Sequence, residues 1–562
     1  MEFDKIFAKE ISKMLDNKLT VKSIMKLIEK PKHSTQGDIA FPCFTLAKLL
    51  KKSPNAIAIN LAEQLKHPLF AKIVAEGPYV NGFFNKETVG KKVINTILQQ
   101  KSLYGTPEVK KEGTITIDFS SPNIAKPFSM GHLRSTVIGN SLANIAEKCG
   151  YKTVRINHLG DWGTQFGKLI VAYTLWGKES DIKKNPIHEL LSLYVKFHEE
   201  AELKPELENQ ARKWFKKLED GDKEAIMLWQ WFREESLKEF SRIYQLLGVN
   251  FDSYHGEAFY NNKMDKTIEL LNNHDLLSNS EGAQVVNLEN DSLPPCLIKK
   301  SDGATLYATR DLTAALYRQE TYQFTKALYV VGHEQSLHFK QVFLVLEKMG
   351  YDWAKELIHV PFGFILKEGK KMSTRKGKVV LLEKVIEEAI VLAKQNIAVK
   401  NPTLPNKDEV AQQVAVGSII FQDLKNERLN NIEFSIEEML KVEGETGPYI
   451  QYTYARACSI LRKVAEPTHF VFSEGANEYN WLLIKQLMIF PKIIERSFEK
   501  YEPSHIAKYL IDVAQEFNKY YSQVKILTED NQKESRLALV ESTTIVLEEG
   551  LRLLGIQTPR EM

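Results

Sequence analysis

A β-branched, apolar run at residues 114–119 is followed by a proline-bearing loop and then by a helical pattern. The run reads TITIDF, the loop SSPNIAKPFSMGH, and apolar residues recur at spacings of three and four from Leu133 to Ile145. This order predicts a strand, a loop and a helix in close succession. Free backbone N–H groups and the positive end of the helix dipole meet at such a loop, where an anion can bind. Gly131 lets a phosphate approach the backbone and His132 places an imidazole beside it, so the segment predicts a nucleotide site.

A second segment, far downstream, has the chemistry of a phosphate-binding loop. Residues 371–377 read KMSTRKG and follow an apolar run at 359–366. A cationic loop that ends in glycine can close over triphosphate oxygens and neutralise developing charge. Each segment alone has an ordinary interpretation as well: a proline and glycine turn in the first, a solvated lysine-rich turn in the second.

Together the two segments resemble the signatures of class I aminoacyl-tRNA synthetases, normally His-x-Gly-His and Lys-Met-Ser-Lys-Ser. The versions here, and the block HLGDWGTQFG at 158–167, are similar to those of arginyl-tRNA synthetases, and the similarity runs from the N-terminal domain to the last residues. Ser129 departs from the pattern, because it stands where the first signature histidine usually is. Its hydroxyl can donate a hydrogen bond but cannot carry the charge of an imidazole. The second segment lacks the usual second lysine, and Lys126 is the expected compensating cation.

The resemblance implies an arginine–tRNA ligase, which acts in protein translation. Such an enzyme converts arginine and ATP to arginyl-adenylate and pyrophosphate, then transfers arginine to the 3′ end of tRNA(Arg). The attacking α-carboxylate of arginine is already ionised at neutral pH, so no general base is needed. Catalysis must then come from positioning and charge neutralisation. The expected catalytic residues are His132, Lys126, Lys371 and Ser129, and the expected ATP-binding residues are Pro122, Gly131, His132, Gly160, Gly332, Met372 and Ser373.

The arginine substrate sets a separate requirement. A guanidinium is planar and holds five N–H donors in a fixed geometry. A carboxylate that accepts two parallel hydrogen bonds therefore recognises it best. Tyr307 and Asp311 are four residues apart and can share one helix face. The resemblance places the guanidinium pocket there, completed by Gln335, with Asn123 and Glu257 at the ammonium end. Without the resemblance, Tyr307 and Asp311 could form a surface pair on a helix.

The length predicts several domains, and the pattern of apolar runs and helical periodicities along the chain predicts α/β and all-α parts. A chain of 562 residues is too long for one core, and 43% hydrophobic and 26% charged residues are ordinary for a soluble globular protein. We expect a small α/β domain at 1–108, a doubly wound Rossmann-like parallel sheet with a helical insertion at 109–385, and a helical bundle at 386–562. Strands of the parallel sheet are expected at 114–119, 153–156, 327–331 and 358–366. In the charged insertion, Trp214, Trp229, Trp231 and Phe232 are expected as core, with base stacking the alternative.

A net charge of +3 excludes a uniformly basic nucleic-acid binder but allows local basic stripes. In the N-terminal domain Tyr79 could stack on an unpaired base of the tRNA elbow, or be half-buried strand packing. Tyr449 and Tyr452 can share one helix face with Arg456, which suits splayed bases, but the tyrosines could also be core. The expected tRNA-binding residues are Tyr79, Asn81, Tyr449, Tyr452, Arg456 and Met562.

Four widely spaced cysteines and no Cys-x-x-Cys argue against disulfides and a structural zinc site. No apolar run has the length of a membrane span, and the N-terminus has no signal-peptide core. We expect a cytoplasmic monomer with ATP as a substrate, Mg²⁺ carried on the ATP, and no metal site of its own.

Two other functions stay open from the residues alone. Another class I nucleotidyl-transferring enzyme would keep the two phosphate segments but lack Tyr307, Asp311 and the tyrosine-bearing bundle. A catalytically silent RNA-binding relative is hinted at only by Ser129. ATP–pyrophosphate exchange with each amino acid tests the first, and measured aminoacylation tests the second.

Overall fold

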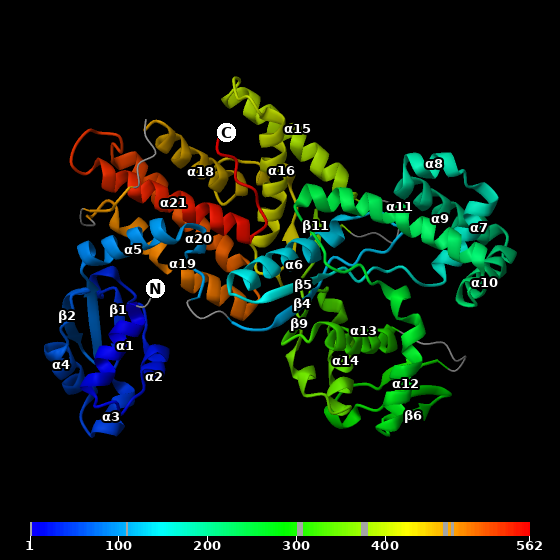
Figure 1. Cartoon of the computed structure of the whole chain (residues 1–562), viewed down its shortest axis with the longest axis horizontal. Coiled ribbons are helices and arrows are strands. Elements are labelled where there is room, and N and C mark those ends of the chain that lie inside the picture. The colour runs from blue at the N-terminus through cyan, green and yellow to red at the C-terminus, as the bar shows by residue number, and fades with distance from the viewer. Residues whose placement is uncertain (1–2, 108–110, 301–306, 373–379, 465–469, 474–476) are drawn as a thin grey trace. The chain divides into compact units, whose positions relative to one another are not determined.

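The computed structural model describes residues 3–107, 111–300, 307–372, 380–464, 470–473 and 477–562 (Figure 1). Its contacts divide the chain into two compact units. The first unit comprises residues 1–105, 453–492 and 512–549; the second comprises 106–452, 493–511 and 550–562.

In the first unit a three-stranded antiparallel sheet has β3 (Tyr79–Phe84) between β1 (Ile39–Pro42) and β2 (Phe70–Glu76). Aromatic rings build its core, since Phe70 stacks on Phe84 at 5.6 Å and meets Phe7 at 5.3 Å. The small α/β domain predicted from the sequence is therefore confirmed. The helices that accompany this sheet are α1 (Phe3–Met14), α2 (Val21–Leu27), α3 (Phe44–Leu50), α4 (Pro54–Gln64) and α5 (Lys86–Gln100).

A four-stranded parallel sheet forms the centre of the second unit. Its strands are β4 (Thr114–Asp118), β5 (Lys152–Ile156), β9 (Lys326–Tyr329) and β10 (Leu357–His359), in the order β10-β9-β4-β5. The chain leaves β4 on one side to form β5, passing through α6 (Met130–Lys148), which packs along both strands (Figure 1). It later returns to the other side of β4 to form β9. Ligands bind such sheets at the carboxyl ends of the strands, where the order reverses, and here that point lies between β4 and β9.

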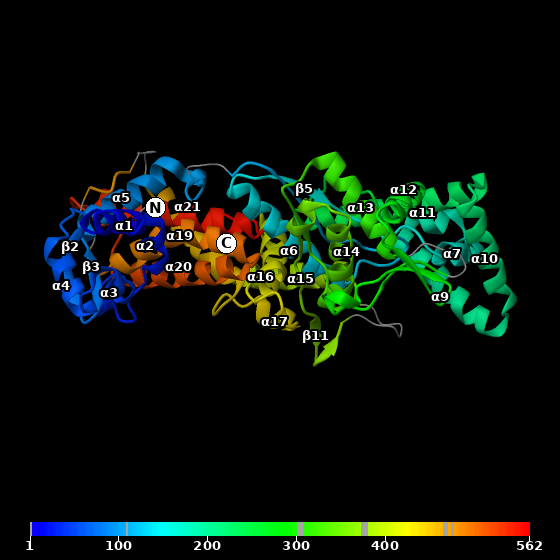
Figure 2. The ribbon, with the colours of Figure 1, turned by 90° about the horizontal axis from the view of Figure 1, so that it is seen from below.

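The single strand expected at 358–366 is wrong. Pro361 and Gly363 interrupt it, and a side chain at Gly363 would lie 2.7 Å from the carbonyl oxygens of Leu429 and Asn430. The chain instead turns into a second small sheet, in which β11 (Ile365–Lys367) lies between β12 (Lys370–Lys371) and β13 (Ile432–Glu433). This sheet stands at the lower edge of Figure 2, where β11 is labelled.

The charged insertion is helical, as predicted. Phe232 is fully buried, as the core interpretation predicts, whereas Trp214, Trp229 and Trp231 are half-buried. The rings of Trp231 and Trp229 pack against Tyr173 and Trp162, with centroids 5.3 and 5.8 Å apart. The helices are α7 (Gln165–Trp176), α8 (Glu179–Lys184), α9 (Pro186–Leu203), α10 (Glu206–Glu219) and α11 (Lys223–Leu247).

After the insertion the chain forms elements that the sequence analysis did not identify. These are an antiparallel sheet of β6 (Leu277–Ser280), β7 (Ala283–Val286) and β8 (Cys296–Lys299), preceded by η3 (Glu257–Lys263) and α12 (Met264–Asn273). The helices α13 (Tyr307–Tyr322) and α14 (Ser336–Lys348) follow, with the short helices η5 (His333–Gln335) and η6 (Asp352–Glu356).

From residue 382 the regular elements of the described chain are helices apart from β13, in agreement with the predicted bundle. In α20, for example, Ile506, Leu510, Val513 and Phe517 are fully buried at the spacing of one helix face. No helix within the described ranges combines the length and apolar character required to span a bilayer. The helices are α15 (Leu382–Lys400), α16 (Lys407–Leu424), α17 (Ile436–Met439), α18 (Gly447–Arg462), α19 (Trp481–Lys500), α20 (Ser504–Gln523) and α21 (Lys533–Leu553).

Candidate active site

The loop between β4 and α6 is held in a strained conformation. Three of its non-glycine residues have left-handed backbones, with φ of 73° at Ser120, 48° at Ser121 and 58° at Ala125. Such strain persists where surrounding groups enforce it, and it is concentrated at functional sites. The Ser120 N–H donates to Ser135 Oγ at 2.9 Å, and the Ala125 N–H donates to Ser236 Oγ at 2.9 Å. Helices α6 and α11 therefore fix the loop at the carboxyl end of β4.

The loop after β5 lies directly against this strained loop. The Gly160 N–H donates to the Pro122 carbonyl at 3.1 Å, and the Gly160 carbonyl accepts from the Ile124 N–H at 3.2 Å. A Cβ at Gly160 would lie 2.2 Å from Asn123 Oδ1, so only glycine permits this approach. Pro122, Gly160 and Asn123, which the sequence analysis assigned to two substrates, are thus neighbours.

His132 is oriented by the residue that replaces the first signature histidine. Ser129 is the N-cap residue of α6, and its backbone N–H donates to His132 Nδ1 at 3.1 Å. The proton of the neutral imidazole is then on Nε2, which leaves Nε2–H as a donor. Burial, together with the positive charge of Lys126, lowers the pKa of His132 to about 4, so the ring is neutral at pH 7.

Gly131 has no packing reason to be glycine. A Cβ built there would meet only Ser129 Oγ, at 3.4 Å, and the residue is exposed. The start of α6 is therefore open on the side of Gly131. The charge of Lys126 acts on His132, and its Nζ lies 5.8 Å from the centre of the Tyr194 ring of α9.

Backbone hydrogen bonds hold the start of the second signature and the chain that follows it. At its start, the Met372 N–H donates to the Ile365 carbonyl at 3.1 Å, and Met372 is buried. Of Lys371 the structure describes the backbone, which belongs to β12. Ser373 and the rest of the signature, to Gly377, lie outside the described residues, as do residues 378 and 379.

After the second signature the chain pairs with the first. The Met130 N–H donates to the Val380 carbonyl at 3.2 Å, the Leu382 N–H donates to the Phe128 carbonyl at 3.1 Å, and Ser129 and Leu381 form an antiparallel bridge. Two segments some 250 positions apart in the sequence thus meet at the start of α6.

Asp311 lies on α13 together with Tyr307, as the spacing predicted. Its side chain is 27% exposed, and His338 Nε2 lies 2.6 Å from Oδ2 while His158 Nε2 lies 4.0 Å from Oδ1. Burial alone would raise the pKa of Asp311, but the hydrogen bond from His338 and the nearby positive charges outweigh it and hold the pKa below its usual value. Asp311 is therefore an ionised, half-buried carboxylate at neutral pH.

A buried ion pair forms the base of this region, and the sequence analysis missed it. Arg318 NH2 lies 2.8 Å from Asp118 Oδ2 and 3.3 Å from His158 Nδ1, with the Arg318 side chain 3% exposed. A signal was present in the sequence. Asp118 ends the first predicted strand, and Arg318 follows Asp311 by seven residues, which is two turns of the same helix face.

Glu257 is a half-buried carboxylate whose surroundings disfavour its ionised form. Its side chain is 15% exposed, and Arg310 NH1 lies 4.0 Å from Oε2. Burial, opposed by Arg310 but reinforced by the negative charges of Asp161 and Asp311, raises the pKa of Glu257 to about 7. An ammonium group placed beside Glu257 would offset this unfavourable charge.

Tyr307 and Gln335 are accessible to a ligand. Tyr307, at the start of α13, is 67% exposed, and Gln335 is exposed in η5, directly after β9. Gly332, which precedes η5, forms a parallel bridge with Phe362, and a Cβ there would lie 2.5 Å from Glu334 Oε2.

Comparison with known protein families covers nearly the whole chain. Residues 93–436 match the model of the class I (R) tRNA synthetase catalytic domain. Residues 1–84 match the arginyl-tRNA synthetase N-terminal domain, and residues 450–562 match the DALR anticodon-binding domain. The chain belongs to the arginyl-tRNA synthetases.

Individual arginyl-tRNA synthetases are similar over their full length. Arginine–tRNA ligase 1 of Bacillus cereus is 62% identical and arginine–tRNA ligase of Enterococcus faecalis is 57% identical, each over 100% of both chains. Among solved structures, Thermus thermophilus arginyl-tRNA synthetase superposes with a TM-score of 0.84 at 26% identity, over 100% of both chains. The Plasmodium falciparum arginyl-tRNA synthetase gives 0.81 at 26% identity, over 100% of this chain and 98% of that one.

In this arginyl-tRNA synthetase the residues expected to bind tRNA differ in accessibility. The half-buried Tyr79 ring meets the edge of the exposed Phe44 at 5.8 Å, whereas Asn81 is buried and its Nδ2 donates to Glu76 Oε2 at 3.0 Å. Their roles in tRNA binding stay predictions.

In the helical region, Tyr449, Tyr452 and Arg456 lie on α18, where both tyrosines are half-buried. The Arg456 guanidinium contacts Asn518 and lies 5.2 Å from the centre of the Tyr521 ring. The carbonyl oxygen of Met562 accepts a hydrogen bond from Asn401 Nδ2 at 3.3 Å. Whether these groups contact tRNA stays a prediction.

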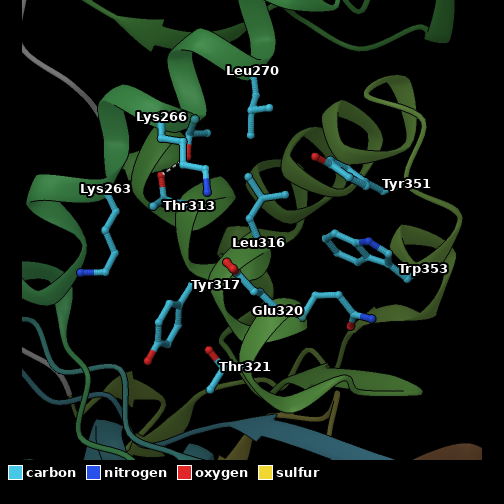
Figure 3. A pocket seen from close by; sticks show the side chains of 12 residues that line it. Lys263, Lys266, Leu270, Thr313, Leu316, Tyr317, Glu320, Thr321, Tyr351 and Trp353 are labelled. Atoms are coloured by element: carbon cyan, nitrogen blue, oxygen red, sulfur yellow. Dashed lines mark hydrogen bonds between the residues drawn. The ribbon is translucent and has the colours of Figure 1, made fainter.

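A groove behind α13 is distinct from the site around Asp311. It has a volume of about 710 Å³ (Figure 3). Thr267 and Thr313 are among its lining residues, and their hydroxyl groups form a hydrogen bond of 2.7 Å. The α13 residues that line it include Leu316 and Glu320, which project from roughly the opposite side of the helix to Asp311. The groove therefore takes no part in the site described above.

Proposed function

We propose that this arginyl-tRNA synthetase activates arginine at the carboxyl ends of β4, β5 and β9, with the two signatures on ATP and Asp311 on the guanidinium. Members of the family join arginine to tRNA(Arg) with ATP, by way of arginyl-adenylate and pyrophosphate. The observation that carries the assignment is the backbone pairing of residues 128–130 with 380–382, which makes the signatures neighbours.

For ATP, the proposed division of roles follows from charge. His132 donates Nε2–H to a phosphate oxygen as a neutral ring, so the charge neutralisation falls to Lys126 and Lys371. Ser129 acts mainly through its backbone N–H, which holds the imidazole in that tautomer. The remaining ATP contacts are proposed at Pro122, Gly131, Gly160, Gly332, Met372 and Ser373.

For arginine, the ionised Asp311 receives the guanidinium, and Tyr307 and Gln335 complete that end of the pocket. Glu257 and Asn123 hold the α-ammonium at the other end. The α-carboxylate of arginine then attacks the α-phosphorus of ATP, and pyrophosphate leaves. Because that carboxylate is ionised at neutral pH, the protein contributes alignment and electrostatic stabilisation rather than proton transfer.

Mg²⁺ is proposed to arrive on the nucleotide, where it would neutralise phosphate charge. Within the described ranges, no group of three His, Cys, Asp or Glu side chains is placed to hold a metal ion. The tRNA contacts are proposed at Tyr79, Asn81, Tyr449, Tyr452, Arg456 and Met562. Boundaries near residues 108 and 385, a monomeric state and a cytoplasmic location also stay predictions.

ATP–pyrophosphate exchange with saturating tRNA(Arg) tests the proposal. His132→Ala should lower kcat by roughly 10²-fold, the usual cost of losing one electrostatic donor, while KM for arginine changes little. His188→Ala is the control, since that histidine is exposed on α9 and pairs with Glu189. Parental kcat in His132→Ala would refute the assignment of the site.

A further inference from the structure

Arg134 is buried at a junction of three segments. Its Nε lies 3.0 Å from Asp423 Oδ2 on α16, and its NH1 donates to the Asn430 carbonyl at 2.7 Å. Its guanidinium carbon lies 5.9 Å from the centre of the Phe362 ring. The side chains of Arg134 and Asp423 are only 1% and 3% exposed.

Arg134 does not face the site. It follows His132 by two residues, which on a helix is about 200° around the axis. The next residue, Ser135, lies about 100° further around α6; its Oγ donates to the Val330 carbonyl at 2.6 Å and accepts from the Ser120 N–H. The first turns of α6 are therefore fixed both to the strained loop and to Arg134's partners.

Residues 428–432, which include Arg134's partner Asn430, pair with the chain that leads into the second signature. The Gly363 N–H donates to the Arg428 carbonyl at 2.9 Å, the Phe364 N–H donates to Asn431 Oδ1 at 2.8 Å, and Ile365 of β11 pairs with Ile432 of β13. Strand β11 leads through β12 to Met372. One guanidinium thus connects the helix of the first signature to the hairpin of the second.

Stability alone gives little reason to bury such a pair. Replacing a buried ion pair by apolar residues of similar size is often neutral or stabilising, whereas removing one partner is costly. What an arginine offers, and a lysine does not, is a rigid planar fork that can hold a carboxylate and a carbonyl at set positions while its face lies on a ring.

We propose that Arg134 is a positioning residue for the activation step: with Asp423 and the Asn430 carbonyl, it sets the spacing between His132 and the second-signature hairpin so that both meet the same ATP. The inference rests on the proposed roles of the two signatures. The proposed role affects kcat rather than KM for arginine, because the arginine pocket on α13 makes none of these contacts.

Two variants separate positioning from stability. Arg134→Lys keeps the charge but loses the fork, and should lower kcat for exchange at least tenfold, measured well below its Tm, with KM for arginine within about twofold. The double variant Arg134→Met with Asp423→Leu should recover the parental Tm to within a few degrees, since no charge is left unpaired, yet keep the tenfold loss of kcat. Arg536→Lys is the matched control, because Arg536 likewise bridges a carboxylate, Asp530, and a carbonyl, that of Ile526. It should lower Tm without lowering kcat for exchange.

The outcomes are decisive in both directions. A double variant that regains both Tm and kcat, or Arg134→Lys with parental kcat per folded molecule, would overturn the inference. If the double variant does not fold, Arg134→Lys decides alone. His132→Ala, assayed in parallel, separates the two proposals: a large loss there with none in Arg134→Lys refutes only the positioning role.

Discussion

Glu257 should make arginine binding weaken as the pH falls below neutrality. Its pKa is raised to about 7, first by burial and then by the charges of Asp161 and Asp311. If Glu257 holds the α-ammonium, only its ionised form binds well, and binding lowers its pKa because a positive charge has been brought beside it. Asp311, whose pKa is held below its usual value, stays ionised over the same range.

The size of the effect follows from the ionised fraction. With a pKa of about 7, roughly half of Glu257 is ionised at pH 7 and about 9% at pH 6. Because apparent affinity scales with the competent fraction, Kd for arginine should rise about fivefold between pH 7 and pH 6. The half of the sites that are protonated at pH 7 must lose their proton on binding, so about 0.5 proton is released per arginine.

Isothermal titration calorimetry at pH 6, 6.5 and 7, in two buffers of different ionisation enthalpy, measures both quantities. Glu257→Gln should bind arginine more weakly at pH 7, with a Kd that is flat across the range and no proton release. An arginine analogue without the α-amino group should give a flat Kd with the parent protein. A parental Kd that does not change between pH 6 and pH 7, without proton release, would refute this role for Glu257.

Three further predictions concern single substitutions. Asp311→Asn should raise KM for arginine at least 100-fold and reduce the preference for arginine over citrulline, while the affinity for ATP is retained. Steady-state exchange kinetics measure this, and an unchanged KM for arginine would contradict the assignment of the guanidinium pocket. Gly131→Ala should raise KM for ATP but keep the parental Tm, since its Cβ meets no atom closer than 3.4 Å. Gly139→Ala should lower Tm, because its Cβ would lie 2.2 Å from the Phe119 ring. Glu257→Gln should raise the free energy of unfolding by about 2–3 kcal/mol at pH 8 and by little at pH 4.5. Because the pKa of Glu257 is raised to about 7 in the folded protein, its ionised form destabilises the fold fully only above pH 7. Denaturant titrations at both pH values test the sign of the change.

Local pattern was sufficient for much of the fold and the site. The strands at 114–118, 152–156 and 326–329 were predicted from short apolar runs, and Tyr307 and Asp311 share a helix because their spacing is helical. The two signatures were identified by their residue types, and their adjacency was a prediction that the pairing of Ser129 with Leu381 supports.

Features that depend on distant contacts were not predictable in this way. The break at Pro361 and Gly363 is enforced by carbonyl groups of residues 429 and 430, which are far away in the sequence. The Asp118–Arg318 and Arg134–Asp423 pairs each join residues about 200 or more positions apart. The pKa of Glu257 depends on burial, which no single-sequence pattern reports. Short polar strands such as β6 form because their neighbours pair with them, not because of their own propensity.

The most direct test of the account is charging of purified tRNA(Arg) with labelled arginine, by the parent and by Asp311→Asn, with and without a 100-fold excess of citrulline or lysine. The account predicts that the parent charges arginine at a rate that neither competitor lowers, and that Asp311→Asn loses this charging. Inhibition of the parent by citrulline, or normal charging by Asp311→Asn, would contradict the claim that the two signatures lie beside a pocket in which Asp311 binds the guanidinium of arginine.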